Sequence, residues 1–574
     1  MLVERGTKMA DVLWIDIGKG TSERTPLDRE LELTGGRHLI NVFLDKYAKP
    51  GSDPLGQDNI LVLSCGPLAG QGVSSAGRLS IGALSPLTGG AKESNAGGLA
   101  ADALARQGLR AVVIGGLPTD DAWRILIVED GDVRFEPANG MIGCGNYETA
   151  EKLRERFGDS YVLITLGQGG EQLLTAAGIA VADGQGRPSR MAARGGLGAV
   201  MGSRRIKAIL VRKTQDGINR DNEEFRQAVL NFNKFVAESD RVKTLAQYGT
   251  ASTVMLTNSL GGLPTRNFST GVFEGAEDIS GENLLDLIRQ RGKPSQNHHR
   301  CMETCVIGCS NVLADQNGRE IVSPLEYETL CLMGSNLGLK DIDEIAKLNY
   351  ICNDLGVDTI DIGVAMGILA EEGRLRFGEM ADFHQALMKV GAGTDLGRII
   401  GMGAAFTGAK IEARRIPVAK GQAFSAYDPR AVKGTGVTYA TSPMGGDHTA
   451  GLTVFVPVDH HSKKGQLELS RNIQIQRAGY DSLGLCAFLL GATGSRPDLV
   501  TDMLNALYKT GLEPSYLDRL GRETIRLELK INQAAGIGPD ANKLPDFFRQ
   551  ESLGDDRLTW DFDPQELIDF WQDI

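Results

Sequence analysis

The stretch Cys301-Met-Glu-Thr-Cys305-Val-Ile-Gly-Cys309 places three cysteines within nine residues, with three residues in each gap. Thiolates are soft ligands, and a tight group of them selects zinc or an iron–sulfur centre. A cubane iron–sulfur cluster takes four thiolates, and a short run commonly supplies three of them while the fourth lies far along the chain. Cys486, in Asp481-Ser-Leu-Gly-Leu-Cys486, is a candidate for that fourth ligand.

Two other chemistries use cysteines at similar spacing. Zinc would take the three thiolates together with His298 or His299, but the usual zinc knuckle leaves only about two residues between its cysteines. Radical enzymes that use S-adenosylmethionine have a longer gap followed by a shorter one, whereas this run has equal gaps and lies among expected helices. The spacing therefore favours the cubane cluster over both alternatives.

Composition excludes several classes of protein. The chain has 574 residues, which suggests about two to four domains. Its net charge is −12 and it has no basic run, so no nucleic-acid partner is expected. No apolar stretch approaches the roughly 20 residues that span a bilayer, and the start of the chain lacks the apolar core of a signal peptide. We therefore expect a cytoplasmic protein without a membrane partner.

Eight cysteines in a chain of this length do not form a disulfide scaffold. Besides the four named above, Cys65, Cys144, Cys331 and Cys352 lie in apolar surroundings. We expect these four to be buried, inert thiols.

Two kinds of hydrophobic pattern divide the chain. Residues 9–210 contain short β-branched runs bounded by turn residues, which predict strands. Beyond residue 222, apolar residues recur at helical spacing over the ranges 223–248, 282–291, 342–355, 360–375, 499–509 and 516–535. We therefore predict an α+β fold, in which a strand-rich N-terminal domain over residues 1–210 is followed by two mainly helical domains over residues 211–430 and 431–574.

Two glycine-rich passages interrupt the strand-rich part, one around Arg78 and the other around Arg194. Glycine lets backbone amides approach an anionic ligand, and arginine can donate two hydrogen bonds to a phosphate. Tight turns with solvated arginines explain the same pattern, and the spacing does not choose between the two. A dinucleotide site is disfavoured, because Gln172 stands where the third small residue of Gly167-Gln-Gly169-Gly170 would be needed.

Two polar stretches are candidates for acid–base chemistry. Glu326 and Glu328 flank a tyrosine, and such carboxylates suit proton transfer if one of them is buried. The alternative is an acidic first turn of a helix, which the helix dipole favours. His448 follows Gly-Gly-Asp on an expected loop, where functional groups gather, although a lone histidine is more often structural.

Taken together, these stretches resemble the aldehyde ferredoxin oxidoreductase family of tungsten- or molybdenum-pterin enzymes, from about residue 9 to residue 535. The matching pieces follow the family's order, and they are Ser85-Pro-Leu-Thr-Gly, Ser94-Asn95-Ala-Gly-Gly, Arg194-Gly-Gly-Leu-Gly-Ala-Val-Met-Gly-Ser, the cysteine run, Glu326-Tyr-Glu-Thr, Leu355-Gly-Val-Asp358-Thr-Ile, Tyr439-Ala-Thr-Ser and Asp481-Ser-Leu-Gly-Leu-Cys486.

The resemblance implies a strand-rich base that carries the cofactor, with two helical domains above it. In the family, two pterins bind one tungsten or molybdenum through four dithiolene sulfurs, so no side chain needs to bind that metal. Carried over by motif, the pterin contacts would be Arg78, Asn95, Gly97, Arg194, Gly195, Gly196, Leu197, Asn353, Val357, Asp358, Asp481, Leu485 and Ala487.

The resemblance also implies one [4Fe–4S] cluster, bound by Cys301, Cys305, Cys309 and Cys486. Glu328 and His448 match the family's acid–base pair, in which the carboxylate moves a proton and the imidazole donates to the substrate carbonyl oxygen. The implied reaction is oxidation of an aldehyde to a carboxylic acid. Electrons would leave singly to a ferredoxin or an iron–sulfur subunit, and the chain would form an oligomer.

Several positions depart from the best-known members. Their first two cysteines are closer together than Cys301 and Cys305, and Met444 and Ala450 stand where they carry basic residues near the pterin. Lys347 replaces a glutamate of a metal site between subunits, so we do not expect that site here. These differences indicate a divergent branch with its own carbonyl substrate.

Two further functions remain as alternatives. The same cofactors serve low-potential reduction of an acid or of an activated aromatic ring. A non-catalytic electron-transfer subunit would keep the cysteines, but intact Glu328, His448 and pterin segments argue against it.

Overall fold

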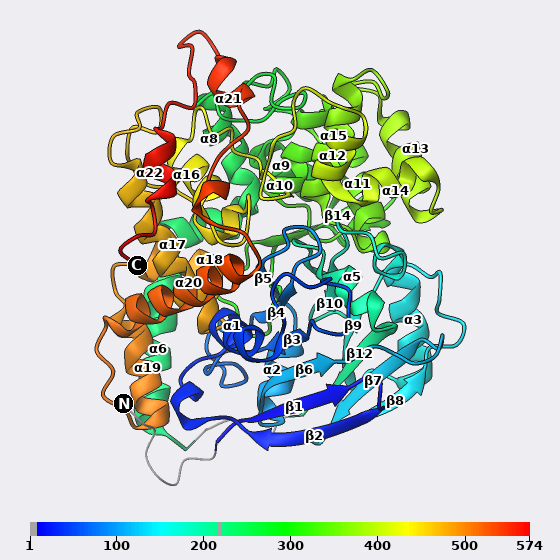
Figure 1. Ribbon diagram of the computed structural model, residues 1–574, viewed down its shortest axis with the longest axis vertical. Helices are drawn as coiled ribbons and strands as arrows, with labels where there is room; N and C mark the ends of the chain where they lie inside the picture. The colour runs from blue at the N-terminus through cyan, green and yellow to red at the C-terminus, as the bar shows by residue number, and fades with distance from the viewer. Residues whose placement is uncertain (1–8, 215–220) are drawn as a thin grey trace.

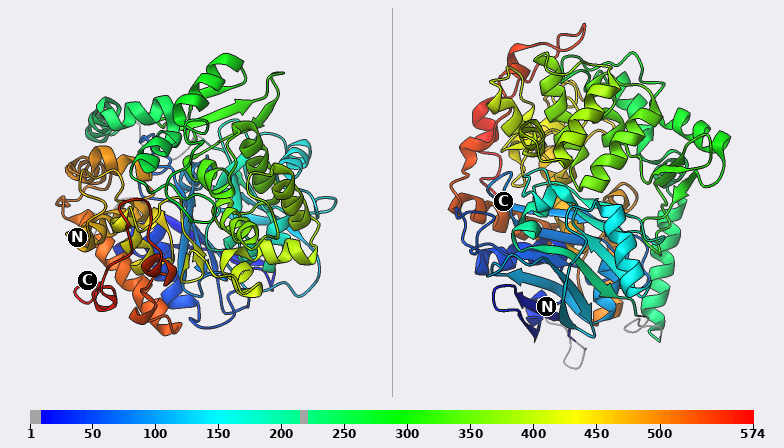
Figure 2. Two further views of the ribbon diagram at one scale, coloured as in Figure 1. Left: turned by 90° about the horizontal axis from the view of Figure 1, so that it is seen from above. Right: turned by 90° about the vertical axis from the view of Figure 1, so that its right-hand side faces the viewer.

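The computed structural model describes residues 9–214 and 221–574 (Figures 1 and 2). In Figure 1 the strands of the first two sheets, β1 to β12, lie in the lower half of the molecule, helices α9 to α15 lie above them, and helices α17 to α20 run along one side. The prediction of an α+β fold, strand-rich at the N-terminus and mainly helical beyond it, is confirmed.

The first sheet has six strands in the order β2-β1-β6-β3-β4-β5. Only β1 and β6 pair in parallel; the other neighbours are antiparallel. The bounds are β1 Asp11–Asp16, β2 Thr21–Pro26, β3 Leu61–Ser64, β4 Leu79–Leu84, β5 Ala91–Ala96 and β6 Leu109–Gly115.

The second sheet also has six strands, in the order β11-β10-β9-β12-β7-β8. The bounds are β7 Arg124–Glu129, β8 Asp132–Pro137, β9 Tyr161–Thr165, β10 Ile179–Ala182, β11 Pro188–Ala192 and β12 Ile206–Arg212. The helices of this part are α1 Gly36–Tyr47, α2 Ala100–Arg106, α3 Asn146–Phe157, α4 Gln168–Glu171 and α5 Leu197–Ser203.

Alternation along the strands separates two cores. Leu13 and Ile15 of β1 point into a core that both sheets share, whereas Val12 points to the opposite face. On that face, Ile40 of α1 and Ile531 of α20 cover the first sheet. The C-terminal part therefore packs directly on the strand-rich part.

The helical part begins after residue 220. Its helices are α6 Glu223–Glu238, α7 Asp240–Tyr248, α8 Thr253–Ser259, α9 Gly281–Arg291, α10 Tyr327–Leu332, α11 Ile342–Leu355, α12 Thr359–Glu371, α13 Met380–Gly391, α14 Asp395–Gly401, α15 Gly403–Lys410, α16 Lys433–Thr441, α17 Gln466–Ser482, α18 Ala487–Thr493, α19 Asp498–Tyr508, α20 Tyr516–Ala534, α21 Phe547–Gln550 and α22 Pro564–Ile568.

Two predicted helices differ in extent from the observed ones. The range 223–248 is divided between α6 and α7, because Ser239 adopts an extended backbone with φ −65° and ψ 130°. The helix predicted to reach residue 375 ends at Glu371, where Gly373 follows with φ +69°. Such a left-handed glycine commonly ends a helix.

The sequence suggested that the cysteine run lies among helices, but the structure places it between two strands. It connects β13 (Gln296–His299) to β14 (Ser310–Ala314), which pairs in turn with β15 (Glu320–Val322) in a small antiparallel sheet. These strands are short, and β13 is polar throughout, so they lack the alternating apolar pattern that marks a strand. A two-stranded ribbon, β16 (Val418–Ala419) and β17 (Gln422–Ala423), was missed for the same reason.

Within residues 9–214 and 221–574, no helix combines the length and the hydropathy that crossing a bilayer requires.

A buried ion pair links the two ends of the chain. Arg37 on α1 donates from Nε and Nη2 to the two carboxylate oxygens of Glu528 on α20, each over 2.7 Å. Replacing Glu528 by Gln should lower the free energy of unfolding by about 3–5 kcal/mol, because a buried guanidinium loses its bidentate counter-ion. Calorimetry should show this as a lower midpoint of thermal unfolding.

Asp518→Asn is the matched control, because Asp518 pairs with Arg522 on the exposed side of the same helix. An exposed pair contributes less than about 1 kcal/mol. Equal midpoints for the two variants would contradict the structural role assigned to the Arg37–Glu528 pair.

Candidate active site

The edge strand β5 separates two polar groups of side chains. Alternation places Lys92 on one face of β5 and Glu93 and Asn95 on the other. Asn95 contacts Arg78 and Asp481, whereas Lys92 reaches Asp447. The cofactor residues expected from the sequence accordingly divide between these two faces.

On the Asn95 face, three of the expected residues contact one another. Arg78 donates from Nε to Asn95 Oδ1 over 2.7 Å and from Nη2 to the Asn95 carbonyl over 2.8 Å. Asn95 Nδ2 lies 3.5 Å from Asp481 Oδ1, and Arg477 Nη2 lies 3.2 Å from the same oxygen. Arg477 Nη1 is buried without a hydrogen-bond partner among the described residues, so it can donate to a further polar ligand.

The cysteines join this face. Cys486 donates from its backbone N to the Ser75 carbonyl over 2.8 Å, and the Ser75 hydroxyl donates to Cys305 Sγ over 3.3 Å. Gly97 lies against Cys301: a Cβ atom at Gly97 would stand 2.9 Å from Cys301 Sγ. The distant Cys486 and the run at 301–309 thus belong to one buried region, and Leu485 is part of the same core.

Burial raises the pKa of Cys301 to about 12, to which repulsion from Cys305 and Cys486 contributes while Arg190 and Arg78 oppose it. The Cys301 thiol therefore ionises only when a cation binds it. Among the described residues, no three His, Cys, Asp or Glu side chains are arranged to enclose a single metal ion. The four-cysteine cluster accordingly stays a prediction. The other four cysteines are buried, as expected.

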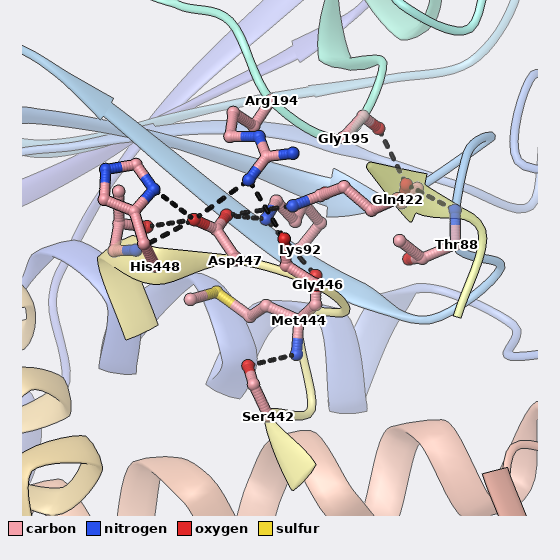
Figure 3. Close-up of polar contacts among 12 residues, drawn as sticks. Thr88, Lys92, Arg194, Gly195, Gln422, Ser442, Met444, Gly446, Asp447 and His448 are labelled. Carbon is pink, nitrogen blue, oxygen red and sulfur yellow. Dashed lines mark hydrogen bonds and ion pairs between the residues drawn. The ribbon is translucent and has the colours of Figure 1, made fainter. Parts of the chain in front are cut away.

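On the Lys92 face, Arg194 is the centre of a buried charge network (Figure 3). Its guanidinium lies 3.3 Å from Asp358, 3.9 Å from Asp361 and 3.5 Å from Asp447. Arg194 Nη1 also donates to the Ser425 hydroxyl over 3.1 Å. Two expected cofactor residues, Arg194 and Asp358, are therefore partners of each other.

The glycines after Arg194 allow close backbone approach. Gly195 has φ +87°, and a Cβ atom there would stand 2.4 Å from Cγ of Lys92. Gly196 has φ +74°, and a Cβ atom there would stand 2.6 Å from the Thr175 carbonyl oxygen. Any larger residue at either position would require the surroundings to move.

The segment 176–178 brings two distant motifs together. Gly198, directly after Leu197, donates to the Ala177 carbonyl over 3.0 Å, and Asp358 donates to the Ala176 carbonyl over 2.9 Å. Val357 forms a β-bridge with Ala177. Asn353 is buried at the end of α11, while Ala487 begins α18 beside Cys486 on the other side of the site.

Glu328 and His448 face each other. Glu328 Oε2 accepts from the Ala426 backbone N over 2.8 Å, and Oε1 lies 3.5 Å from His448 Nε2. Oε1 has no hydrogen-bond partner among the residues described. His448 Nδ1 lies 2.6 Å from the Ser425 hydroxyl.

Burial raises the pKa of Glu328 to about 8 and lowers the pKa of His448 to about 3. Near pH 7 the carboxyl therefore carries a proton while the imidazole is neutral. Glu328 also lies in the first turn of α10. Both interpretations of this stretch therefore apply, because Glu328 lies in the first turn of the helix and is also half-buried in the site.

Sequence reasoning missed three residues of this site: Lys92, Ser425 and Asp447. Asp447 directly precedes His448, and this adjacency was a signal that could have identified it. Nothing in the local sequence marks Ser425. Lys92 sits in Gly-Gly-Ala-Lys92-Glu-Ser-Asn95, where a single lysine among small residues suggests only a solvated side chain.

Comparison with known proteins identifies the family. The model of the aldehyde ferredoxin oxidoreductase N-terminal domain matches residues 12–213, and the model of domains 2 and 3 of the same enzymes matches residues 227–567. The chain belongs to the aldehyde ferredoxin oxidoreductase family. It is therefore an oxidoreductase, and the resemblance inferred from its motifs is confirmed.

Relatives of known name are similar over almost the whole chain. The tungsten-containing aldehyde ferredoxin oxidoreductase of Pyrococcus horikoshii is 29% identical over 572 residues, covering 94% of this chain and 91% of that protein. Its counterpart in Thermococcus kodakarensis is 30% identical, covering 90% and 87%. Identities this low agree with a divergent branch.

A solved structure shares the fold. The active site complex BamBC of benzoyl coenzyme A reductase, bound to 1,5-dienoyl-CoA, contains a chain with a TM-score of 0.80 and 18% identity. The match covers 100% of this chain and 94% of that one.

The raised pKa of Glu328 predicts a pH dependence of stability. The pKa rises from 4.5 to about 8 on folding, so the stabilisation is fully present below pH 4.5 and is lost as the pH rises through 8. Glu328→Gln removes this dependence. Its free energy of unfolding relative to the wild type should increase by about 3–5 kcal/mol between pH 4 and pH 9.

Thermal or urea unfolding at several pH values measures this difference. Glu282→Gln, at an exposed position on α9, is the control and should follow the wild type throughout. If Glu328→Gln also parallels the wild type, Glu328 is ionised in the folded protein and carries no proton near pH 7.

Proposed function

We propose that this enzyme oxidises an aldehyde to a carboxylic acid at a tungsten or molybdenum centre held by two pterins. One [4Fe–4S] cluster would carry the electrons away. The observation that carries the proposal is the half-buried pair of Glu328 and His448, whose facing atoms Oε1 and Nε2 lie 3.5 Å apart beside the expected cofactor residues. A protonated carboxyl next to a neutral imidazole suits proton transfer near pH 7.

The residues on both faces of β5 fit a large polar cofactor. Arg78, Asn95 and Asp481 would bind one pterin, and the unpartnered Nη1 of Arg477 offers a further donor. Arg194 and the glycines after it would contact the other pterin, where the absence of side chains leaves the backbone accessible. When bound, the metal–pterin group would supply the two-electron redox step.

One tautomer of His448 suits this reaction. Arg194 donates to the Ser425 oxygen, and the Ser425 hydroxyl can donate in turn to His448 Nδ1. A neutral imidazole that accepts at Nδ1 carries its proton on Nε2. His448 Nε2 would therefore donate to the carbonyl oxygen of the substrate and stabilise negative charge as it develops there.

Glu328 would accept and donate protons during the reaction. An aldehyde and water become a carboxylic acid with release of two electrons and two protons. A carboxyl with a pKa of about 8 both accepts and gives up a proton near neutral pH. Because Glu328 Oε1 has no partner among the described side chains, it is available to a water molecule or to the substrate.

The four cysteines would bind the cluster that receives the electrons. Cys301, Cys305, Cys309 and Cys486 would each supply a thiolate, and the Ser75 hydroxyl already donates to Cys305 Sγ. We propose a ferredoxin or an iron–sulfur subunit as the electron acceptor. Free thiols in this number suit the reducing cytoplasm.

A second reaction fits the same residues. A carboxyl that keeps its proton at pH 7 is a ready donor for low-potential reduction of an acid or of an activated aromatic ring. Assays in both directions distinguish the two: an aldehyde with an oxidising one-electron dye, and an acid or aromatic thioester with a reduced dye.

Metal analysis tests the cofactor assignment. Protein purified without air should contain about four irons and about one tungsten or molybdenum per chain. Cys486→Ser should lose most of the iron, because it removes one corner ligand of the cluster. Cys65→Ser, at an equally buried thiol in the first sheet, should keep it. Zinc as the sole metal would overturn the interpretation of the cysteine run.

Substitution of His448 tests the catalytic assignment. His448→Ala should reduce aldehyde-dependent dye reduction at least about 100-fold, the usual contribution of a general acid–base group, and leave the cluster absorbance in place. His384→Ala, on the distant helix α13, is the control. Unchanged turnover in His448→Ala would remove His448 from the mechanism, whereas a loaded wild type without turnover in either direction would favour the electron-transfer subunit.

A further inference from the structure

Lys92 is a buried lysine inside the candidate active site. Its side chain is 0% exposed, and Nζ lies 2.5 Å from Asp447 Oδ2 and 3.3 Å from the Met444 carbonyl oxygen. Figure 3 shows it reaching from β5 to the loop that carries His448. A buried ammonium is costly, so its placement beside a functional loop requires an explanation.

Asp447 receives donors on both of its oxygens. Lys92 and Gln422 Nε2 donate to Oδ2, the latter over 3.1 Å. Oδ1 accepts from the backbone N of Thr449 over 2.9 Å and from its hydroxyl over 2.8 Å. Asp447 thereby caps the short turn His448–Ala450 that carries the imidazole.

Asp447 and Ser425 are competing partners for His448. Asp447 Oδ1 lies 3.8 Å from His448 Nδ1, whereas the Ser425 hydroxyl lies 2.6 Å from that nitrogen. A carboxylate that moved onto Nδ1 would draw a proton to that nitrogen. The donors on Oδ2 oppose this movement, because they fix the other side of the carboxylate.

We propose that Lys92 is a positioning residue. It fixes Asp447 away from the imidazole of His448, so that Nδ1 contacts Ser425 and Nε2 remains available to the substrate. The inference rests on the proposed function only for the identity of that substrate. The contacts among Lys92, Asp447 and His448 stand without it.

The charges around His448 determine what happens when Lys92 is removed. Glu328 faces it from α10, Asp447 from its own turn, Arg194 from the loop before α5, and Arg477 from α17. Burial, Arg194, Arg477 and Lys92 all lower the pKa of His448, while Asp447 raises it. Loss of Lys92 therefore raises this pKa, because the charge of Asp447 is less compensated.

The stem of Lys92 has a separate packing role. Its Cγ, Cδ and Cε atoms occupy the space over Gly195, where a Cβ atom would stand 2.4 to 2.9 Å from them. Lys92→Met keeps most of this stem and removes the charge. The variant therefore separates the electrostatic role from packing on the glycine loop.

Labelling of His448 with diethylpyrocarbonate, followed by mass spectrometry, tests the proposal in the holoenzyme between pH 5 and pH 7.5. Only neutral imidazole reacts. Wild-type reactivity, corrected with a free histidine standard, should stay nearly constant, because His448 is neutral throughout. In Lys92→Met it should fall at least about twofold toward pH 5, because Asp447 is released from Lys92, can move onto Nδ1 and then favours the protonated imidazole.

Lys207→Met is the matched control. Lys207 is equally buried and pairs with Glu171 in the second sheet, away from His448. It should reproduce any general loss of stability and leave His448 labelling unchanged. The double variant Lys92→Met, Asp447→Asn removes both charges and should restore constant labelling, since asparagine also caps a turn.

Constant labelling in Lys92→Met, or the same fall in Lys207→Met, would overturn the proposal. If Lys92→Met does not fold, Lys92→Gln is subject to the same criteria. In the Lys92 variants, kcat should decline toward acid over the same pH range in which His448 labelling declines. A wild type that oxidises no aldehyde would refute the proposed function, yet the labelling would still decide the role of Lys92.

Discussion

A buried charge is costly unless an opposite charge pairs with it, and this constraint determines how the strand-rich base and the helical parts of the chain meet. Arg194 lies among three carboxylates, from α12 and from the loop before His448. Arg37 joins α1 to α20 through Glu528, and Lys92 joins the first sheet to Asp447. Leaving any of these groups unpaired would cost several kcal/mol, so the strand-rich base and the helical parts are fixed in one relative position.

The protonation states around the acid–base pair depend on this network of buried charges. Asp447 is ionised, because Lys92 and Arg194 hold its pKa well below its usual range against the effect of burial. Among the residues that the structure describes, Glu328 has no cation in direct contact, and it keeps a proton that burial favours. Two carboxyl groups on either side of one imidazole thus differ in charge, and this difference allows one to organise the site and the other to transfer protons.

Much of this organisation was visible in the sequence, because it is local. The pattern of β6 and α20, the spacing of the cysteines and the glycines beside Arg194 all follow from short-range geometry. Where local signals were weak, the prediction failed: polar β13 was missed. The break at Ser239 was also missed, because helical periodicity continues through a residue that leaves the helix.

By itself, the sequence determined the α+β class, the family and the residue types of the candidate site, since short motifs carry that information. Only the tertiary structure decided which of those residues contact one another and which are charged. Lys92 and Asp447 are 355 residues apart along the chain, and no periodicity relates them. The proton on Glu328 likewise depends on burial beneath segments distant in sequence, because a pKa reflects the whole surrounding field rather than the neighbouring residues.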